Sequence, residues 1–376
     1  MKFSVQSKTL STAVSAVSKV INSKNAMAVL NNFLFELNEG VLTVIGSDLE
    51  NTLKIKLNVA NSDSNMRFCV DARRMVDLMK ELPDVGVNFE INPETYEIKI
   101  TYTGGNYEFM GIRGEEYPET ISSEENEQNL HLECAGFIVL SGIDNTIFAV
   151  GTEAVRPQMM GILWDIHYSD ITFVASDTHK LVRFINTNFE PGIEGSFILP
   201  VKPANILKSI LGKDDNLKIT LTHQNVTFSN GEFELCSSFI KGEFPAYNKV
   251  IPVSNPYTLT IDRQQLLNSV RRMSIFGDQS HKLMKFRITP EQIVIKTQDK
   301  GFCTLGEETL RCDFTGTEMV IGFSAQFLIE IFSTLTTENV VIQLADPSRP
   351  GVFTPSENQE KCDLVILLMP MSVTEF

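Results

Sequence analysis

The chain has 376 residues, of which 43% are hydrophobic and 21% charged, and its formal net charge at pH 7 is −15. This length exceeds what one hydrophobic core usually supports, so two or three domains of an ordinary globular protein are expected. No run of 18 or more apolar residues predicts a membrane span, and the negative charge argues at first against a nucleic-acid partner.

The first residues, Met1 to Gln6, lack the apolar core of a signal peptide, so a cytoplasmic location is expected. The predicted elements follow them. A helix is predicted over 7–22 because apolar residues recur at helical spacing, with lysines and serines on the other face. A second helix is predicted over 71–82. Antiparallel strands are predicted at 33–38, 42–45, 51–59, 98–101 and 107–112. Apolar and polar residues alternate over 51–59, which predicts a strand buried on one face only.

The strand-to-helix signal of Val70–Leu78 recurs at Leu199–Leu207 and Phe323–Ile331, close to one third of the chain apart. Further helices are predicted at 134–149, 202–213, 262–274 and 324–335. Further strands are predicted at 161–167, 171–176, 181–186, 217–222, 226–229, 233–238, 283–288, 292–297, 302–313, 340–344 and 364–369. Repeats of this size predict an α+β protein of three similar domains, at 1–122, 127–251 and 256–376. The boundaries are placed at the acidic segment 122–128 and the Pro-bounded segment 252–256.

The predicted helices differ in charge from the whole chain. Together they carry eleven basic and six acidic residues, a net of +5, which leaves −20 for the rest. Basic helical faces gathered on one surface would let an acidic protein hold DNA phosphates there alone. Lysine and arginine are also good helix formers, and charged helix faces are usually only solvated, so charge alone leaves DNA binding open.

Catalytic and metal-binding patterns are weak in this sequence. The six cysteines show no CxxC pair and mostly lie in apolar patterns, so buried reduced thiols are expected, and neither a metal nor a cofactor is predicted. Ser176, Asp177 and His179 lie together, but triad members normally come from separate segments, and a flanking Gly-x-Ser-x-Gly is absent. The chain is predicted not to be an enzyme, and a repeat scaffold that binds only proteins is the alternative to a DNA-binding protein.

Short motifs occur in a fixed order along the whole chain. They are Met1–Phe3, Leu30–Leu34, Gly46–Glu50, Ser176–Leu181, Phe244–Tyr247, Val250–Pro252 and Met369–Met371. In this order, and on a threefold repeat, they resemble the bacterial DNA polymerase III beta subunit family of replicative sliding clamps.

The resemblance implies a clamp fold, in which each of three domains packs two helices on antiparallel sheets and a head-to-tail dimer closes into a ring. Such a ring encircles double-stranded DNA independently of sequence and confers processivity by tethering partners through a peptide-binding cleft. The implied partners are the replicative polymerase catalytic subunit, a clamp loader, other polymerases and repair proteins with clamp-binding peptides, and a second copy of the chain. A membrane partner is not expected.

The resemblance also implies three sets of site residues. By position, Lys24 and Lys202 match DNA-contacting residues of the family, and Arg73, Arg271 and Arg272 are added because they lie on predicted helix faces. The implied cleft residues are Arg156, Met159, Ser176, Thr178, His179, Lys180, Leu181, Pro245, Val250, Leu367, Met369, Pro370 and Met371. The implied dimer interface pairs Arg74, Leu78, Tyr107 and Phe109 with Ile275, Phe276, Glu307 and Glu308. The alternative is that Leu78, Ile275 and Phe276 belong to domain cores.

The chain departs from the family pattern beside the implied cleft. Pro157-Gln158 stands where aromatic residues are familiar, and Thr178 replaces a common glycine, so the preferred peptide motif is expected to differ. The insertion-like segment 354–361 is predicted to form a longer loop. The segment 372–376 extends past Met371, and it is expected to cover or extend part of the cleft.

Overall fold

The computed structural model describes residues 1–22, 24–25, 27–122, 129–252, 254–278, 280–374 and 376. The chain forms two compact units by its internal contacts. Unit 1 contains residues Met1–Phe137 and Lys202–Phe239, and unit 2 contains Ile138–Val201 and Ile240–Phe376. Most of the first predicted linker, 122–128, lies outside the described residues, as does Val253 in the second.

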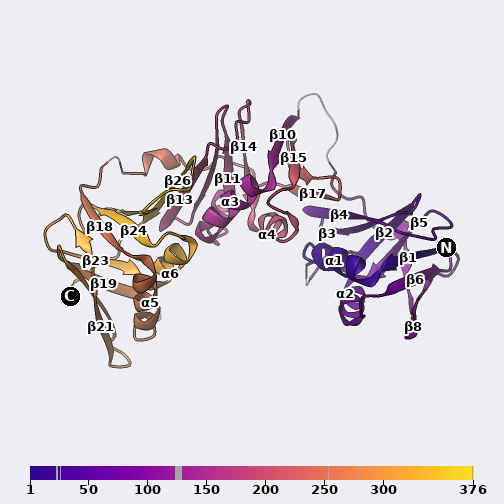
Figure 1. Ribbon diagram of the computed structural model, residues 1–376, viewed down its shortest axis with the longest axis horizontal. Coiled ribbons are helices and arrows are strands. Elements are labelled where there is room, and N and C mark those ends of the chain that lie inside the picture. The colour runs from indigo at the N-terminus through magenta and orange to yellow at the C-terminus, as the bar shows by residue number, and fades with distance from the viewer. Residues whose placement is uncertain (23, 26, 123–128, 253, 279, 375) are drawn as a thin grey trace. The chain divides into compact units, whose positions relative to one another are not determined.

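Unit 1 contains two antiparallel sheets within the described residues. The smaller has the strand order β1 (Lys2–Gln6), β6 (Gly86–Ile91), β7 (Glu97–Tyr102), β8 (Gly105–Met110). The larger has the order β10 (Leu130–Ala135), β15 (Asn216–Leu221), β16 (Asn225–Ser229), β17 (Phe233–Ser238), β4 (Asn51–Asn58), β3 (Val41–Ser47), β2 (Asn32–Asn38), β5 (Met66–Asp71), β9 (Ile112–Arg113). Helices α1 (Ser7–Val17) and α2 (Ala72–Glu81) pack against each other and against these strands (Figure 1).

Unit 2 repeats this arrangement. Its larger sheet has the order β14 (Gly195–Pro200), β11 (Gly161–Ile166), β12 (Ile171–Ser176), β13 (Lys180–Asn186), β26 (Cys362–Leu368), β25 (Gly351–Pro355), β24 (Asn339–Leu344), β18 (Tyr257–Asp262), β22 (Asp313–Phe314). Its smaller sheet has the order β21 (Thr304–Arg311), β20 (Gln292–Asp299), β19 (Leu283–Ile288), β23 (Met319–Ser324). Helices α5 (Arg263–Ser274) and α6 (Ala325–Thr334) lie side by side in this unit (Figure 1).

Each larger sheet continues across a junction between two of the sequence repeats. In unit 1, β17 of the second repeat pairs with β4 of the first, with Leu235 opposite Leu53. In unit 2, β13 of the second repeat pairs with β26 of the third, with Leu181 opposite Leu367. The central repeat therefore contributes strands to both units, and the junctions bury strand edges that would otherwise be open to aggregation.

Helices α2 and α5 begin where the sequence supplies a capping aspartate. The Asp71 carboxylate accepts a hydrogen bond from the Arg74 N–H at 2.7 Å, and Asp262 does the same for Gln265 at the start of α5, also at 2.7 Å. These carboxylates satisfy amide groups that have no partner inside the helix. Helices α3 (Gly136–Thr146) and α4 (Val201–Ile210) complete the six that were predicted, so their number is confirmed among the described residues.

Some predicted bounds are wrong. The first helix ends at Val17 rather than at residue 22, because residues 18–20 form a turn. The segment 354–361 is not entirely a loop, since Thr354 and Pro355 pair with Val341 and Val340 as the end of β25.

The expectation that β4 is buried on one face only is also wrong. Asn51, Thr52 and Leu53 are all buried, because β17 continues the sheet beside this end of the strand. At the other end, Ile55 and Leu57 are half-buried rather than part of the core. No helix in the described ranges is long and apolar enough to cross a membrane.

Candidate functional site

A tight turn between β12 and β13 carries most of one predicted site. The Ser176 hydroxyl donates to the Lys180 carbonyl at 2.9 Å and accepts from the Thr178 N–H at 3.2 Å. The Asp177 carboxylate accepts from the N–H groups of His179 and Lys180, at 2.9 and 2.8 Å. These bonds hold Thr178 at a φ of 78°, in the left-handed region that favours glycine. The turn therefore presents Thr178 and His179 to solvent in a fixed conformation.

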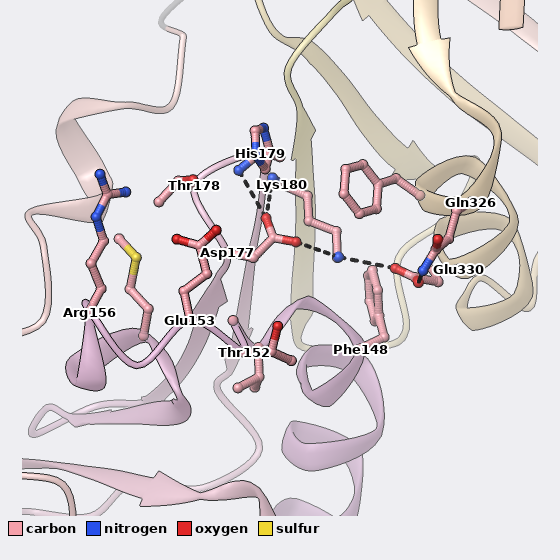
Figure 2. Close-up of a pocket in the computed structure, with 14 residues that line it drawn as sticks. Phe148, Thr152, Glu153, Arg156, Asp177, Thr178, His179, Lys180, Gln326 and Glu330 are labelled. Carbon is pink, nitrogen blue, oxygen red and sulfur yellow. Dashed lines mark hydrogen bonds and ion pairs between the residues drawn. The ribbon is translucent and has the colours of Figure 1, made fainter. Parts of the chain in front are cut away.

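Lys180 is buried behind this turn, with only 5% of its side chain exposed. Its ammonium lies 2.6 Å from the Asp177 carboxylate and 3.1 Å from that of Glu330 on α6 (Figure 2). It also lies 4.1 Å from the centre of the Phe327 ring. A buried charge requires such partners, so Lys180 ties the turn to helix α6 and is not a freely available surface cation.

His179 links the same turn to two other segments. Its imidazole stacks on the Phe327 ring, with the ring centres 6.1 Å apart and the planes at 23°. Its backbone carbonyl accepts a hydrogen bond from the Met369 N–H at 2.8 Å. Segments from the central and C-terminal repeats therefore meet at residues 176–181.

A cavity of about 440 Å³ adjoins this turn (Figure 2). The predicted residues that line it are Arg156, Met159, Thr178, His179 and Lys180. The carboxyl groups of Glu153 and Asp177 point into the same space, whereas the guanidinium of Arg156 extends away from them (Figure 2).

The other predicted cleft residues surround an apolar cluster next to the turn. Leu181 and Leu367 face each other across β13 and β26 and are 8% and 4% exposed. Their cluster also contains Leu163, Val174, Ile198, Tyr247, Val352 and Val365. Phe244 and Ile251, which flank Pro245 and Val250 in the sequence, pack on it while partly exposed, and Val250 and Met369 are exposed. This surface offers an apolar floor with exposed apolar residues beside it.

Tyr247 is a buried member of the cluster that forms this floor. Its hydroxyl donates a hydrogen bond to the Asp165 carboxylate at 2.8 Å. Burial is the main cause that raises the pKa of Tyr247 to about 12, and the nearby Asp165 carboxylate contributes a smaller part. The phenol is therefore neutral at physiological pH and remains a hydrogen-bond donor.

Sequence reasoning missed the contribution of α6 to this site. Gln326, Phe327 and Glu330 line the cavity, yet none was predicted. A signal was present, because Phe327 is an aromatic residue outside the buried stripe of Leu328, Ile331 and Phe332.

The turn between β3 and β4 of unit 1 is built like that of 176–181. The Ser47 hydroxyl accepts from the Leu49 N–H at 3.1 Å, Asp48 accepts from the Asn51 N–H at 2.6 Å, and Leu49 has a φ of 75°. Here, however, the Tyr117 hydroxyl accepts from the Ser47 N–H at 2.9 Å and lies buried in a cluster with Leu30, Leu34, Ile45 and Cys69. Thr52 and Cys236 face each other at the positions that correspond to Leu181 and Leu367, so smaller side chains replace the two leucines. The turn is thus repeated beside an apolar cluster of its own, but without the leucine pair that Leu181 and Leu367 form in unit 2.

The predicted DNA-contact residues differ in how freely they present charge. Lys24 is exposed, and the Arg73 side chain is 94% exposed with Asp77 3.8 Å away. The Lys202 ammonium instead lies 2.6 Å from the carboxylate of buried Asp48 and also donates to Asn22 and to the Val20 carbonyl.

The two arginines near the end of α5 also make contacts within the chain. Arg271 donates to the Ser333 hydroxyl at 3.2 Å, and Arg272 makes a two-pronged contact with Glu308 at 2.9 and 2.7 Å. Hydrogen bonds from Arg272 lower the pKa of the Glu308 carboxyl. The structure therefore pairs a predicted DNA-contact residue with a predicted interface residue.

Each smaller sheet ends in an edge strand that carries predicted interface residues. On β8, Tyr107 is exposed and Phe109 is half-buried, with the Arg74 guanidinium 5.8 Å from the Phe109 ring centre. Near β21, Ile275 and Phe276 are 73% and 46% exposed. Ile275 and Phe276 therefore do not belong to a domain core, whereas Leu78 is half-buried on α2.

Comparisons with known proteins agree along the whole chain. Three family profiles match consecutive segments: the N-terminal domain of the DNA polymerase III beta subunit at residues 1–121, its central domain at 138–246, and its C-terminal domain at 248–372. The chain is 24% identical over 373 residues to the beta sliding clamp of Pseudomonas aeruginosa, covering 99% of this chain and 100% of that one. It is 24% identical over 381 residues to the beta sliding clamp of Synechocystis sp., covering 94% and 96%.

Solved structures match the fold over nearly the same length. A crystal structure of the DNA polymerase sliding clamp from Pseudomonas aeruginosa with ligand has a TM-score of 0.91 at 23% identity, covering 99% of this chain and 100% of that chain. A DNA polymerase III beta subunit from Thermotoga maritima has a TM-score of 0.90 at 21% identity, with the same coverage. These likenesses confirm the predicted α+β clamp fold of three domains.

Proposed function

We propose that this chain, which belongs to the DNA polymerase III beta subunit family, acts as a beta sliding clamp that encircles duplex DNA and tethers a replicative polymerase. It is a processivity factor and not an enzyme. A ring linked topologically to DNA needs no base contact, so its affinity along the helix can stay low while escape requires an interface to open. The domains proposed remain 1–122, 127–251 and 256–376, and the proposed location is the cytoplasm.

Segments that are distant in the sequence meet around residues 176–181, and this observation supports the part of the proposal that concerns partner proteins. The turn, the end of β26 and helix α6 meet there, beside the apolar floor of Leu181 and Leu367. We place the docking cleft for short partner peptides on this surface. Methionines such as Met159 and Met369 suit varied peptides, because their side chains repack readily. The proposed occupants are peptides of the polymerase catalytic subunit, the clamp loader, other polymerases and repair proteins.

The proposed DNA contacts are sequence-independent. Lys24 and Arg73 are exposed cations suited to phosphates, and such contacts position the duplex without reading bases. Arg271 and Arg272 are exposed residues, although both contact neighbours in the chain. Lys202 would reach DNA only by giving up part of its contact with Asp48.

Ring closure is proposed to occur between β8 of one copy and β21 of the next. Both are edge strands, and pairing them would continue the smaller sheets in the way that β4–β17 and β13–β26 continue the larger ones. Exposed apolar residues near both edges would supply the buried centre of this contact. Two identical head-to-tail contacts would close a dimer.

Retention on circular DNA tests this function. The protein is loaded onto a nicked plasmid with its clamp loader, separated by gel filtration in high salt, and then exposed to a restriction enzyme. A clamp stays on the circle in high salt and leaves once the plasmid is linear. Loss from the circle as salt rises would instead indicate groove binding, and a failure to associate with either form would favour a protein-binding scaffold.

A further inference from the structure

We infer that Phe376 is a positioning residue for the proposed peptide cleft, because it anchors the segment after β26 and so holds Met369–Met371 in place. This inference rests on the proposed function of that cleft. It differs from the expectation that residues 372–376 cover or extend the cleft, because Val373 and Phe376 lie against the smaller sheet of the C-terminal repeat.

The segment leaves the cleft region at Met369, just after β26 ends at Leu368. The Met369 N–H donates to the His179 carbonyl at 2.8 Å. Two residues later, the Met371 N–H donates to the Gly322 carbonyl at 2.8 Å, and the two residues form an antiparallel bridge on the edge strand β23. The backbone of Met369–Met371 therefore bridges two different sheets through one hydrogen bond to each.

Gly322 allows the segment to lie close to β23. A Cβ atom at Gly322 would meet the Val373 Cγ2 at 2.7 Å and the Met371 carbonyl oxygen at 2.9 Å. Contacts this short do not occur for real side chains, so any larger residue at this position would push the segment away. The fit is a close approach of backbone to backbone, which is a common reason for glycine in a strand.

Phe376 forms the far anchor of the segment. The Arg287 guanidinium lies 4.2 Å from its ring centre, and the Lys296 ammonium lies 5.7 Å from it. Both cations come from neighbouring strands, β19 and β20. Each also faces a carboxylate, Glu318 at 3.6 Å from Arg287 and Glu307 at 3.5 Å from Lys296. Cations near an aromatic face attract it, so the sheet presents a prepared site for this ring.

The anchor has a direct consequence for the cleft. Among the described residues between Leu368 and Phe376, the N–H groups of Met369 and Met371 donate main-chain hydrogen bonds, and segments held by so few bonds open readily. If the ring were absent, Met369–Met371 would sample other conformations, and a docking peptide would have to order them. The entropy lost when the peptide orders these residues lowers its affinity, although no contact to the peptide is removed.

The test compares Phe376→Ala with wild type by fluorescence anisotropy. The probe is the tightest binder among labelled peptides that tile the replicative polymerase catalytic subunit. We expect Phe376→Ala to raise the Kd about 5- to 10-fold, with a Tm within about 2 °C of wild type, and Phe376→Trp to restore the affinity. Tyr168→Ala, which removes an exposed ring from the β11–β12 turn of the same unit, should leave the Kd unchanged. A Kd for Phe376→Ala within twofold of wild type would overturn the inference.

Two further readouts keep the inference separate from the proposed function. Hydrogen exchange at the Met369 and Met371 amides should be faster in Phe376→Ala, and unchanged protection would also overturn the inference. Arg287→Gln should weaken peptide binding, and its effect should not add to that of Phe376→Ala, because both changes break one contact. If wild type bound no peptide of the panel, the proposed function would fail, while the exchange measurement would still decide whether Phe376 holds the segment.

Discussion

At the scale of single residues, Lys202 shows that position in a family motif and local contacts can assign different roles to one side chain. Its ammonium is 2.6 Å from the Asp48 carboxylate, whose side chain is only 4% exposed. It also satisfies the Val20 carbonyl beyond the end of α1. Lys202 is therefore first a structural cation that joins α4, α1 and the β3–β4 turn within unit 1.

We expect Lys202→Ala to lower the free energy of unfolding by about 1–3 kcal/mol, because it leaves the Asp48 carboxylate buried without its cation. The main-chain N–H groups that still bond to Asp48 limit the loss. Urea denaturation measures the change. Lys8→Ala, on the exposed face of α1, is the matched control and should stay within about 0.5 kcal/mol of wild type. A Lys202→Ala protein as stable as wild type would show that this ion pair contributes nothing.

The structural role of Lys202 also affects the choice of variants that test DNA contact. A loss of DNA retention in Lys202→Ala would mix lost phosphate contact with lost stability. Lys24→Ala and Arg73→Ala avoid this difficulty, because neither side chain has a close buried partner in the structure as described.

The cysteines give a second prediction at this scale. Burial raises the pKa of the Cys69 and Cys134 thiols to about 12, so both are protonated at pH 8, whereas Cys303 is exposed in the β20–β21 turn. The expectation that the cysteines are buried is thus wrong for Cys303, and Cys312 and Cys362 are only partly buried. Because the thiolate is the reactive form, N-ethylmaleimide at pH 8 should modify Cys303 first, adding about one label per chain in the fast phase. Intact-mass spectrometry follows the labelling, and Cys303→Ser should abolish this phase. A fast phase that persists in Cys303→Ser would contradict the assignment.

At the scale of elements, all six helices were predicted, because a strand-to-helix signal recurs three times with a second helix in phase and the first helix shows a clear apolar stripe. Periodicity missed strands such as β1 and β6, whose short alternating patterns give weaker signals. It could not predict that β4 is buried on both faces near Thr52, because that burial comes from β17, which lies far away in the sequence.

The same limit applies to the two repeated turns. Ser47-Asp48 and Ser176-Asp177 look alike in the sequence and fold alike, with matching hydrogen bonds and positive φ values at Leu49 and Thr178. What distinguishes them is the pairing across the sheet, where Leu181 meets Leu367 but Thr52 meets Cys236. The site residues on α6 were missed for a related reason, since only the tertiary fold brings Phe327 to His179.

At the scale of the whole molecule, the proposed ring and the proposed cleft depend on different parts of the chain. The cleft residues of one copy all belong to unit 2 and to one chain, so docking a peptide does not require a second copy. Encirclement of DNA does require one, because it depends on contacts between β8 and β21 of different copies. A variant that breaks only the contact between copies should therefore separate the two functions.

Ile275→Asp is that variant, because Ile275 is 73% exposed beside β21 and its loss leaves the core of unit 2 intact. An aspartate there would place an unpaired carboxylate in the apolar centre of both contacts of the dimer, and desolvating it should weaken the dimer by about 100-fold or more. Sedimentation velocity should show a stably folded monomer, which fails to remain on circular plasmid but binds the polymerase peptide within twofold of wild type. Tyr168→Asp, at a site that is 62% exposed and remote from both edge strands in the sequence, should leave dimer, retention and peptide binding unchanged. If Ile275→Asp stayed dimeric, the interface would lie elsewhere, and if the monomer were still retained on circles, retention would not depend on encirclement.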